Sequence, residues 1–224
     1  MTETDILKKY HKALNHMKKD QWSEARESLI DLRNNSDYTS SQIESALGLS
    51  YQKSNFHGLS IYHQTKASLM DRFNSKLKQN VDLSLQAVPN EAGLKLSHPY
   101  EHAFSLNQYI RPMESLSLGI LFLLICLFTR FYKRYFSKQV FFTLLIALLF
   151  FSISYFTTTA SNIMVIKRES TLLKNPIASS DSLMPVQAGT RVIVIKKNNS
   201  FSQIERSGRF VGWIANKELL SLTD

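Results

Sequence analysis

The segment His98-Pro99-Tyr100-Glu101-His102 combines residue types and spacing that could bind and use a metal ion. Two histidines one helical turn apart can hold zinc while a glutamate between them activates a bound water. This chemistry needs a packed helix and a third ligand, but the segment contains a proline, lies in polar surroundings and precedes no acidic helix. We therefore predict no metal site, no cofactor and no catalytic residue, and expect a protein that is not an enzyme. The other histidines fall in predicted helices, where we expect them to pack or to face solvent: His11, His16, His57 and His63.

The net charge of +9 arises from 27 Lys and Arg side chains against 18 Asp and Glu in 224 residues. The basic excess is uneven, since residues 129–139 hold four basic and no acidic side chains, whereas residues 161–224 hold nine and five. A nucleic-acid-binding domain usually shows a continuous basic stripe with interleaved aromatics, so we predict no nucleic-acid partner. The single cysteine, Cys126, excludes an intrachain disulfide.

Two apolar segments, residues 115–132 and 140–160, predict a membrane hairpin, because about 20 apolar residues can cross a bilayer core. A re-entrant segment is the alternative for the first of them. Residues 133–139 form a basic turn, and basic turns are typical of the cytoplasmic side. Both flanking regions would then lie outside the cytoplasm. The residues predicted to determine this topology are Arg130, Lys133, Arg134 and Lys138.

Residues 1–20 contain no apolar export signal. Export of the N-terminal region therefore needs a start upstream of this sequence or another route of translocation. Otherwise the rule that basic turns are cytoplasmic fails for this chain. We expect the first of these.

Residues 1–82 show an internal period of 35 residues, which pairs Ala13 with Gly48 and Ala25 with Ser60. Small residues at these places suit the crossing points of paired helices, and tetratricopeptide repeats have a period of about 34 residues. The region resembles such repeats, although Lys9 and Glu44 stand where that family often has tryptophan. Arrays of this kind hold peptides or proteins on a concave surface. Candidate binding residues are Tyr51 and Asn55, and residues 83–114 are predicted to be a linker.

Residues 163–224 predict short strands separated by glycine turns, which indicates a small all-β barrel. The pattern Gly189-x-x-Val192-x-Val194 and the closing Gly212-Trp213-Ile214 resemble the bacterial SH3 domain. Candidate binding residues are three aromatics, which either pack the barrel or form a platform for a peptide or a cell-wall fragment: Phe201, Phe210 and Trp213.

The order of these modules, with the repeat-like stretch Leu47–Tyr62 and the ending Gly212-Trp213, resembles BatE of the Bacteroides aerotolerance (Bat) group. The resemblance implies a multidomain protein of the bacterial inner membrane, with its repeat and SH3-like regions in the periplasm. It implies a non-enzymatic scaffold in envelope or oxidative-stress tolerance. The implied partners are von Willebrand A-domain membrane proteins, a MoxR-type ATPase and the lipid bilayer. The alternative is a peptidoglycan-binding membrane anchor that acts through the SH3-like domain.

Overall fold

The computed structural model describes most of the chain, namely residues 3–35, 39–88, 112–133, 138–160, 162–206 and 209–222. Within these ranges, the side chains that are not described belong to residues 3, 112, 129–133, 138–140, 156–160, 206 and 209–210. The chain forms two compact units, Met1–Ser97 together with Ile163–Asp224, and His98–Asn162. The central part of the predicted linker, residues 89–111, lies outside the described residues, and so does the His98–His102 segment.

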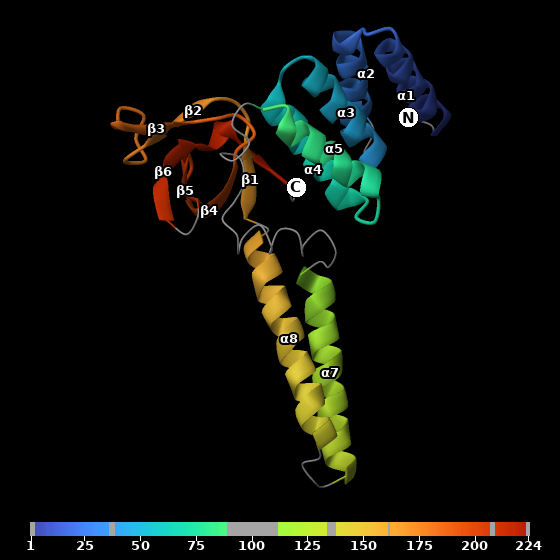
Figure 1. Cartoon of the computed structure of the whole chain (residues 1–224), viewed down its shortest axis with the longest axis vertical. Coiled ribbons are helices and arrows are strands. Elements are labelled where there is room, and N and C mark those ends of the chain that lie inside the picture. The colour runs from blue at the N-terminus through green and yellow to red at the C-terminus, as the bar shows by residue number, and fades with distance from the viewer. Residues whose placement is uncertain are drawn as a thin grey trace. The chain divides into compact units, whose positions relative to one another are not determined.

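The N-terminal region folds into helices that pack in chain order (Figure 1). Their bounds are α1 Glu3–Lys18, α2 Trp22–Asn35, α3 Ser41–Lys53, α4 His57–Met70 and α5 Ser75–Gln86. Both ends of α4 lie 35 residues after the ends of α2, and α3 ends 35 residues after α1. The period seen in the sequence is therefore also the period of the helices.

The turns that follow α1 and α3 share one backbone geometry. Asp20 and Asn55 both have positive φ, 57° and 62°, in the left-handed region that asparagine and aspartate tolerate better than most residues. In the first turn Gln21 N–H donates to His16 C=O at 3.0 Å, and 35 residues later Phe56 N–H donates to Tyr51 C=O at 2.9 Å. These bonds satisfy carbonyl groups that each helix end leaves without an intrahelical partner.

The small residues of the 35-residue period lie where neighbouring helices approach. Ala13 and Ala25 are fully buried, and Ser60, which is 1 % exposed, donates its hydroxyl to Ser84 of α5 at 3.2 Å. A Cβ atom on Gly48 would lie 2.7 Å from Cγ of Gln64, so only glycine leaves room for the glutamine side chain. The core of the array gathers around these positions and includes Leu29, Leu32, Ile43, Ala46 and Leu47.

The C-terminal region is a seven-stranded antiparallel sheet. The strands are β1 Ile163–Ile166, β2 Ser170–Leu173, β3 Ser182–Val186, β4 Arg191–Lys197, β5 Phe201–Arg206, β6 Arg209–Ala215 and β7 Leu219–Ser221. Their order is β3-β2-β6-β5-β4-β1-β7, so β3 and β7 are the edges and, among the described strands, they do not pair with each other. The prediction of a closed barrel is therefore wrong. Local turns specify hairpins, but closure needs a long-range pairing that the turns do not encode.

One face of the sheet buries a cluster of aliphatic side chains, Ile166, Leu172, Val186, Val192, Ile204 and Ile214. The short 3₁₀ helix η2 (Asn216–Glu218) leads into β7. Its last residue, Glu218, receives two hydrogen bonds from Arg168, each 2.7 Å long. This bidentate pair joins the β1–β2 turn to η2.

Helix α4 contacts the sheet through two glycines. A Cβ atom on Gly58 would lie 2.4 Å from the carbonyl oxygen of Lys167, just after β1. A Cβ atom on Gly189, which precedes β4, would lie 2.4 Å from Cδ1 of Ile61. Gly189 also has a φ of 86°, which other residues adopt only with strain. Each glycine therefore permits an approach that a larger residue would block.

The second unit contains the helices α7 (Pro112–Lys133) and α8 (Lys138–Ala160), which lie side by side (Figure 1). The helices are close at Gly119, where a Cβ atom would lie 3.5 Å from the carbonyl oxygen of Ala147, an ordinary van der Waals distance. The rings of Phe122 and Phe150 stack with centroids 5.7 Å apart.

In the part of the chain that the structure describes, no helix has both the length and the hydropathy that crossing a lipid bilayer requires. The uninterrupted apolar stretches are short, residues 118–128 in α7 and residues 144–151 in α8, whereas a crossing takes about 20 apolar residues. The predicted spans at 115–132 and 140–160 are therefore wrong. The same finding overturns the prediction of a multidomain membrane protein. It also overturns the predicted two-span inner-membrane location with periplasmic flanking regions.

The structure does not test the topological role predicted for the four basic residues. Arg134 lies outside the described residues. Arg130 and Lys133 belong to α7 and Lys138 begins α8, but their side chains are not described.

Candidate functional site

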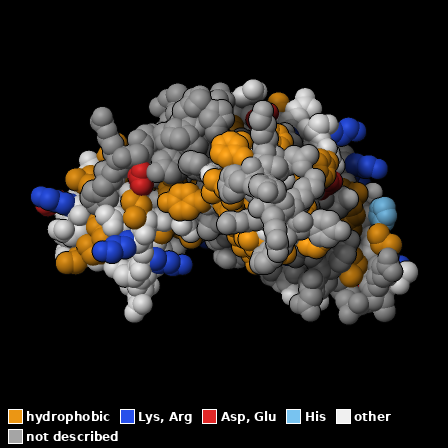
Figure 2. Space-filling model, turned by 90° about the horizontal axis from the view of Figure 1, so that it is seen from below, with side chains coloured by type: hydrophobic (Ala, Val, Ile, Leu, Met, Phe, Trp, Pro, Cys, Tyr) orange, Lys and Arg blue, Asp and Glu red, His pale blue; other side chains and the backbone are white. Residues whose placement is uncertain are grey.

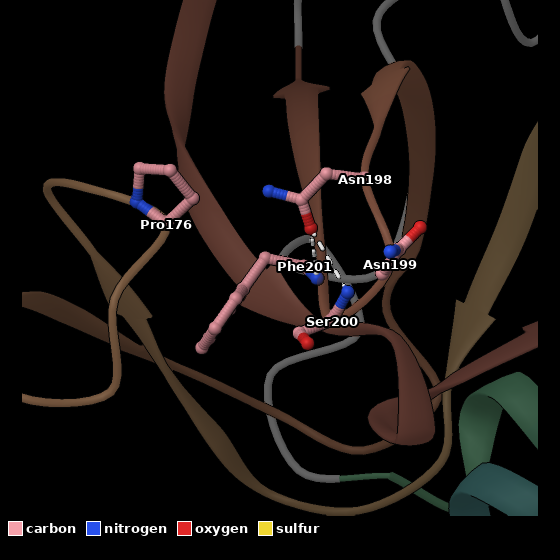
Figure 3. Close-up of a pocket in the computed structure, with 5 residues that line it drawn as sticks. All are labelled: Pro176, Asn198, Asn199, Ser200 and Phe201. Carbon is pink, nitrogen blue, oxygen red and sulfur yellow. Dashed lines mark hydrogen bonds between the residues drawn. The ribbon is translucent and has the colours of Figure 1, made fainter.

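A pocket of about 410 Å³ opens on the sheet domain between the β4–β5 turn and the loop that joins β2 to β3 (Figure 3). Figure 3 shows the carboxamide nitrogen of Asn198 pointing toward Pro176, and the Phe201 ring extending along the same side of the turn. The residues that line the pocket are Pro176, Asn198, Asn199, Ser200 and Phe201.

The β4–β5 wall of the pocket is held rigid by hydrogen bonds. The side-chain oxygen of Asn198 accepts from the backbone N–H groups of Ser200, at 3.0 Å, and Phe201, at 2.6 Å. The carboxamide of Asn216 donates to the carbonyl oxygen of Asn198 at 2.8 Å and accepts from the Ser202 hydroxyl at 2.7 Å. Asparagine favours such turns because its side chain bonds to nearby backbone groups.

The opposite wall is ordered in the same way. Backbone N–H groups of Lys174 and Asn175 donate to the Asp181 carbonyl oxygen, at 3.0 Å, and to the Ser180 hydroxyl oxygen, at 2.9 Å. Pro176 is therefore presented by a closed loop. Both walls are hydrogen-bonded without a ligand, and such preorganisation reduces the conformational entropy that is lost on binding.

The lining of the pocket supplies groups that can bind a ligand. None of its lining side chains is a carboxylate, a histidine or a cysteine, and Ser200 has no base beside it among these residues. Phe201 and Pro176 supply apolar surface, while the asparagine amides and the serine hydroxyl supply hydrogen-bonding groups. A few oriented polar groups on an apolar wall are typical of ligand pockets.

Two of the three predicted aromatics share one face of the sheet. Phe201 lies opposite Ala215, and Gln203 lies opposite Trp213, in the β5–β6 pairing. Because side chains alternate along a strand, Phe201 and Trp213 are diagonal neighbours on the same face. Phe201 lines the pocket and Trp213 does not. Phe210 lies in β6 opposite Glu205, but its side chain is not described.

The other two predicted binding residues, Tyr51 and Asn55, lie at the end of α3. The half-buried Tyr51 ring stacks on His63 with centroids 5.2 Å apart, and the Arg26 guanidinium lies 5.4 Å from the Tyr51 ring centroid. Asn55 is exposed and adopts the left-handed backbone of the turn. In this structure Tyr51 therefore packs helices together, and Asn55 makes a turn.

A buried hydrogen-bonded pair, His63 and Glu44, lies against Tyr51, and the sequence pattern does not predict it. Nδ1 of His63 lies 2.6 Å from Oε2 of Glu44, with side-chain exposures of 4 % and 0 %. Burial lowers the pKa of His63, and the bond to Glu44 only partly offsets this effect. Burial alone would raise the pKa of Glu44, but the His63 hydrogen bond and nearby positive charges, His63 first, leave that pKa below its usual value.

A leucine recurs at one position of the helical repeat. Leu14 of α1, Leu49 of α3 and Leu83 of α5 occupy equivalent places, since the caps Ser40 and Asn74 set α3 and α5 34 residues apart. Leu49 is 37 % exposed and Leu83 is 49 % exposed. Helices α3 and α5 therefore each expose a leucine at the same position of the repeat.

The metal chemistry considered for the His98–His102 segment falls outside the described residues. Within the described ranges, no group of three or more His, Cys, Asp or Glu side chains is placed to hold a metal ion. This finding concerns those ranges alone.

No protein-family model matches this chain, and neither a curated protein nor a solved structure does. The resemblance to the Bat group therefore stays a prediction, as do the partners that it implies.

Proposed function

We propose that this chain is a non-enzymatic adaptor that binds partner proteins, with an extended peptide segment held in the Phe201 pocket. The observation that carries the proposal is the pocket itself, an open cavity of about 410 Å³ between two hydrogen-bonded turns. Its volume lies in the range of small-ligand pockets. An extended peptide presents a side chain for the apolar wall and backbone groups for the asparagine amides.

The helical array gives the adaptor a second surface. Stacked helix pairs of this kind bind protein segments along their inner helices and perform no chemistry of their own. The exposed leucines of α3 and α5 are the apolar contacts that such a segment would meet. Two surfaces on one chain raise the effective concentration of one partner near another.

Selection from a peptide library tests the proposal. The purified full-length chain is used to select peptides from a random ten-residue library displayed on phage, and the selected peptide is synthesised and titrated by calorimetry. Phe201→Ala removes the aromatic wall, and we expect it to weaken binding by about 1–3 kcal/mol, as expected for loss of an aromatic contact. Selection of no peptide, or a peptide indifferent to Phe201→Ala, contradicts the proposal.

The matched control is Phe73→Ala. Phe73 is 85 % exposed and stands before α5, away from the pocket lining. Its loss is expected to leave peptide affinity unchanged. A parallel titration with soluble peptidoglycan fragments separates the peptide proposal from the cell-wall alternative, since tight binding of the fragments through Phe201 would favour the latter.

A further inference from the structure

The chain around the pocket carries basic side chains and no acidic ones. Residues 174–178 and 196–203, which extend two residues beyond the lining positions on each side, contain three lysines and neither Asp nor Glu. Lys174, Lys196 and Lys197 are all exposed. Figure 2 shows Lys and Arg side chains at several places on the part of the molecule that the sheet forms, at the left.

The register of the sheet places one of these lysines beside the aromatic face. Lys196 of β4 lies opposite Gln203, and Gln203 lies opposite Trp213. Opposed residues in antiparallel strands point to the same side of the sheet. A ligand that runs across β4, β5 and β6 would therefore meet a lysine, a glutamine and a tryptophan in order.

Two acidic side chains of the described sheet, Glu218 and Glu205, contribute little negative charge to this rim. Glu218 is held by Arg168 in a bidentate pair. Glu205 lies near the opposite end of β5, opposite Ile193 and Phe210. Asp181 is exposed and lies beside Lys174, whose backbone N–H donates to the Asp181 carbonyl oxygen at 3.0 Å. The charges around the pocket therefore sum to a net positive value, with three exposed lysines against one aspartate.

We propose that the peptide held by the pocket is acidic, with an apolar side chain against Phe201 and carboxylates facing Lys174, Lys196 and Lys197. This inference rests on the proposed function and specifies the ligand class of the same pocket. Rim charges of one sign attract an oppositely charged ligand, and they raise its association rate more than its final affinity. The apolar contact then holds the ligand, while the lysines select for its charge.

The test compares the selected peptide with a neutral version in which each Asp and Glu is replaced by Asn or Gln. Both are titrated into the full-length chain, and association rates are measured by stopped-flow fluorescence. We expect the acidic peptide to associate about tenfold faster than the neutral one at low salt. The difference should shrink as the salt concentration rises from about 0.05 M to about 0.5 M, because screening shortens the range of the attraction.

The variants reverse charge at the rim and elsewhere. Lys196→Glu combined with Lys197→Glu should slow association of the acidic peptide about tenfold and leave the neutral peptide unaffected. The matched control, Lys8→Glu combined with Lys12→Glu, reverses two exposed lysines on α1 and should change neither rate. Lys174→Glu, in the other wall, provides an independent variant if the first pair reduces folding as measured by circular dichroism.

The outcomes separate the two proposals. Selected peptides without acidic residues, or equal association of the acidic and neutral versions, overturn the inference while Phe201-dependent binding keeps the proposed function. The inference is also overturned if the control pair slows association of the acidic peptide as much as the rim variants do, because the charge effect would then be general. Failure of every peptide to depend on Phe201 overturns the proposed function itself.

Discussion

Nδ1 of His63 and Oε2 of Glu44 lie 2.6 Å apart in the interior of the helical array, and both side chains are almost wholly shielded from solvent. The second carboxylate oxygen of Glu44, Oε1, has no hydrogen-bond partner in the described structure. A buried charge is costly unless it is paired, so removing either partner leaves an uncompensated polar group. The pair makes the stability of the array depend on protonation.

The first prediction is that the protein loses stability in mild acid. The folded-state pKa of His63 lies below 6.5 and that of Glu44 below 4.5. The unfolded chain therefore binds protons more readily than the folded chain at both groups. Their contribution to the free energy of unfolding is full above the unfolded pKa values and falls as the pH drops, first below 6.5 through His63 and then below 4.5 through Glu44.

Urea unfolding at a series of pH values measures this dependence. His63→Gln should flatten the slope of unfolding free energy against pH between about 5 and 7, where an unperturbed histidine titrates. His11→Gln, an exposed histidine on α1, is the control and should keep the wild-type slope. An unchanged slope in His63→Gln would assign the acid sensitivity to other groups.

The second prediction concerns the close approach at Gly48. Gly48→Leu places a side chain where Cγ of Gln64 lies 2.7 Å from the new Cβ, and we expect a loss of about 1–3 kcal/mol from overpacking. Ala25→Leu, at a fully buried position, should act in the same direction. Both should also reduce capture of any segment that binds the array. The control Gln42→Leu adds the same side chain at an exposed site of α3, and a similar loss there would contradict the steric explanation.

The third prediction concerns the positive φ of Asn55. Asn55→Gly should change stability by only a few tenths of a kcal/mol, since glycine adopts this conformation freely. Asn55→Val should cost about 1–2 kcal/mol, because a β-branched side chain strains the left-handed region. At Asp20, whose φ is 57°, the glycine variant should likewise be more stable than the valine variant. Urea midpoints of the four variants check this, and equal values for valine and glycine would refute it.

The fourth prediction concerns the pair between Arg168 and Glu218. The hydrogen bonds from Arg168 are the main cause that keeps the pKa of Glu218 below 4.5, against the opposing effect of burial. This contribution is present above about pH 4.5 and disappears as the pH falls through the lowered pKa of Glu218. Arg168→Gln should therefore lower the urea midpoint at neutral pH.

The difference in urea midpoint between Arg168→Gln and the wild type should vanish in acid. Lys174→Gln, which removes an exposed charge from another loop, should keep the wild-type midpoint at both pH values. A loss that persists unchanged in acid would show that Arg168 stabilises the sheet through packing rather than through the carboxylate.

Several local features follow from the sequence because they depend on near neighbours. The 35-residue spacing of Ala13 and Gly48 marks helix crossings, since helical periodicity and steric size are properties of short segments. The turns at Asp20 and Asn55 use residue types that tolerate positive φ. Phe201 is one of the three aromatics predicted to pack or to bind, and it lines the pocket.

Pairings between distant segments did not follow from the sequence. Glu44 and His63 are 19 residues apart on neighbouring helices, and Arg168 and Glu218 are 50 residues apart. Pro176 meets the Asn198–Phe201 turn only because β2 pairs with β6 and β6 pairs with β5. In the sequence, a polar residue on a helix surface cannot be told from a polar residue in the core. The two differ only once the position of the neighbouring helix or strand is known.

The sequence by itself determined the period of the helices, the sites of turns and the uneven distribution of charge, because each arises from residues close together in the chain. Tertiary structure alone decided that the sheet ends in two unpaired edges, that Glu44 and His63 meet in the interior, and that a proline and a phenylalanine enclose one pocket. These outcomes depend on register and packing between segments far apart in the chain, and short-range preferences do not specify that register.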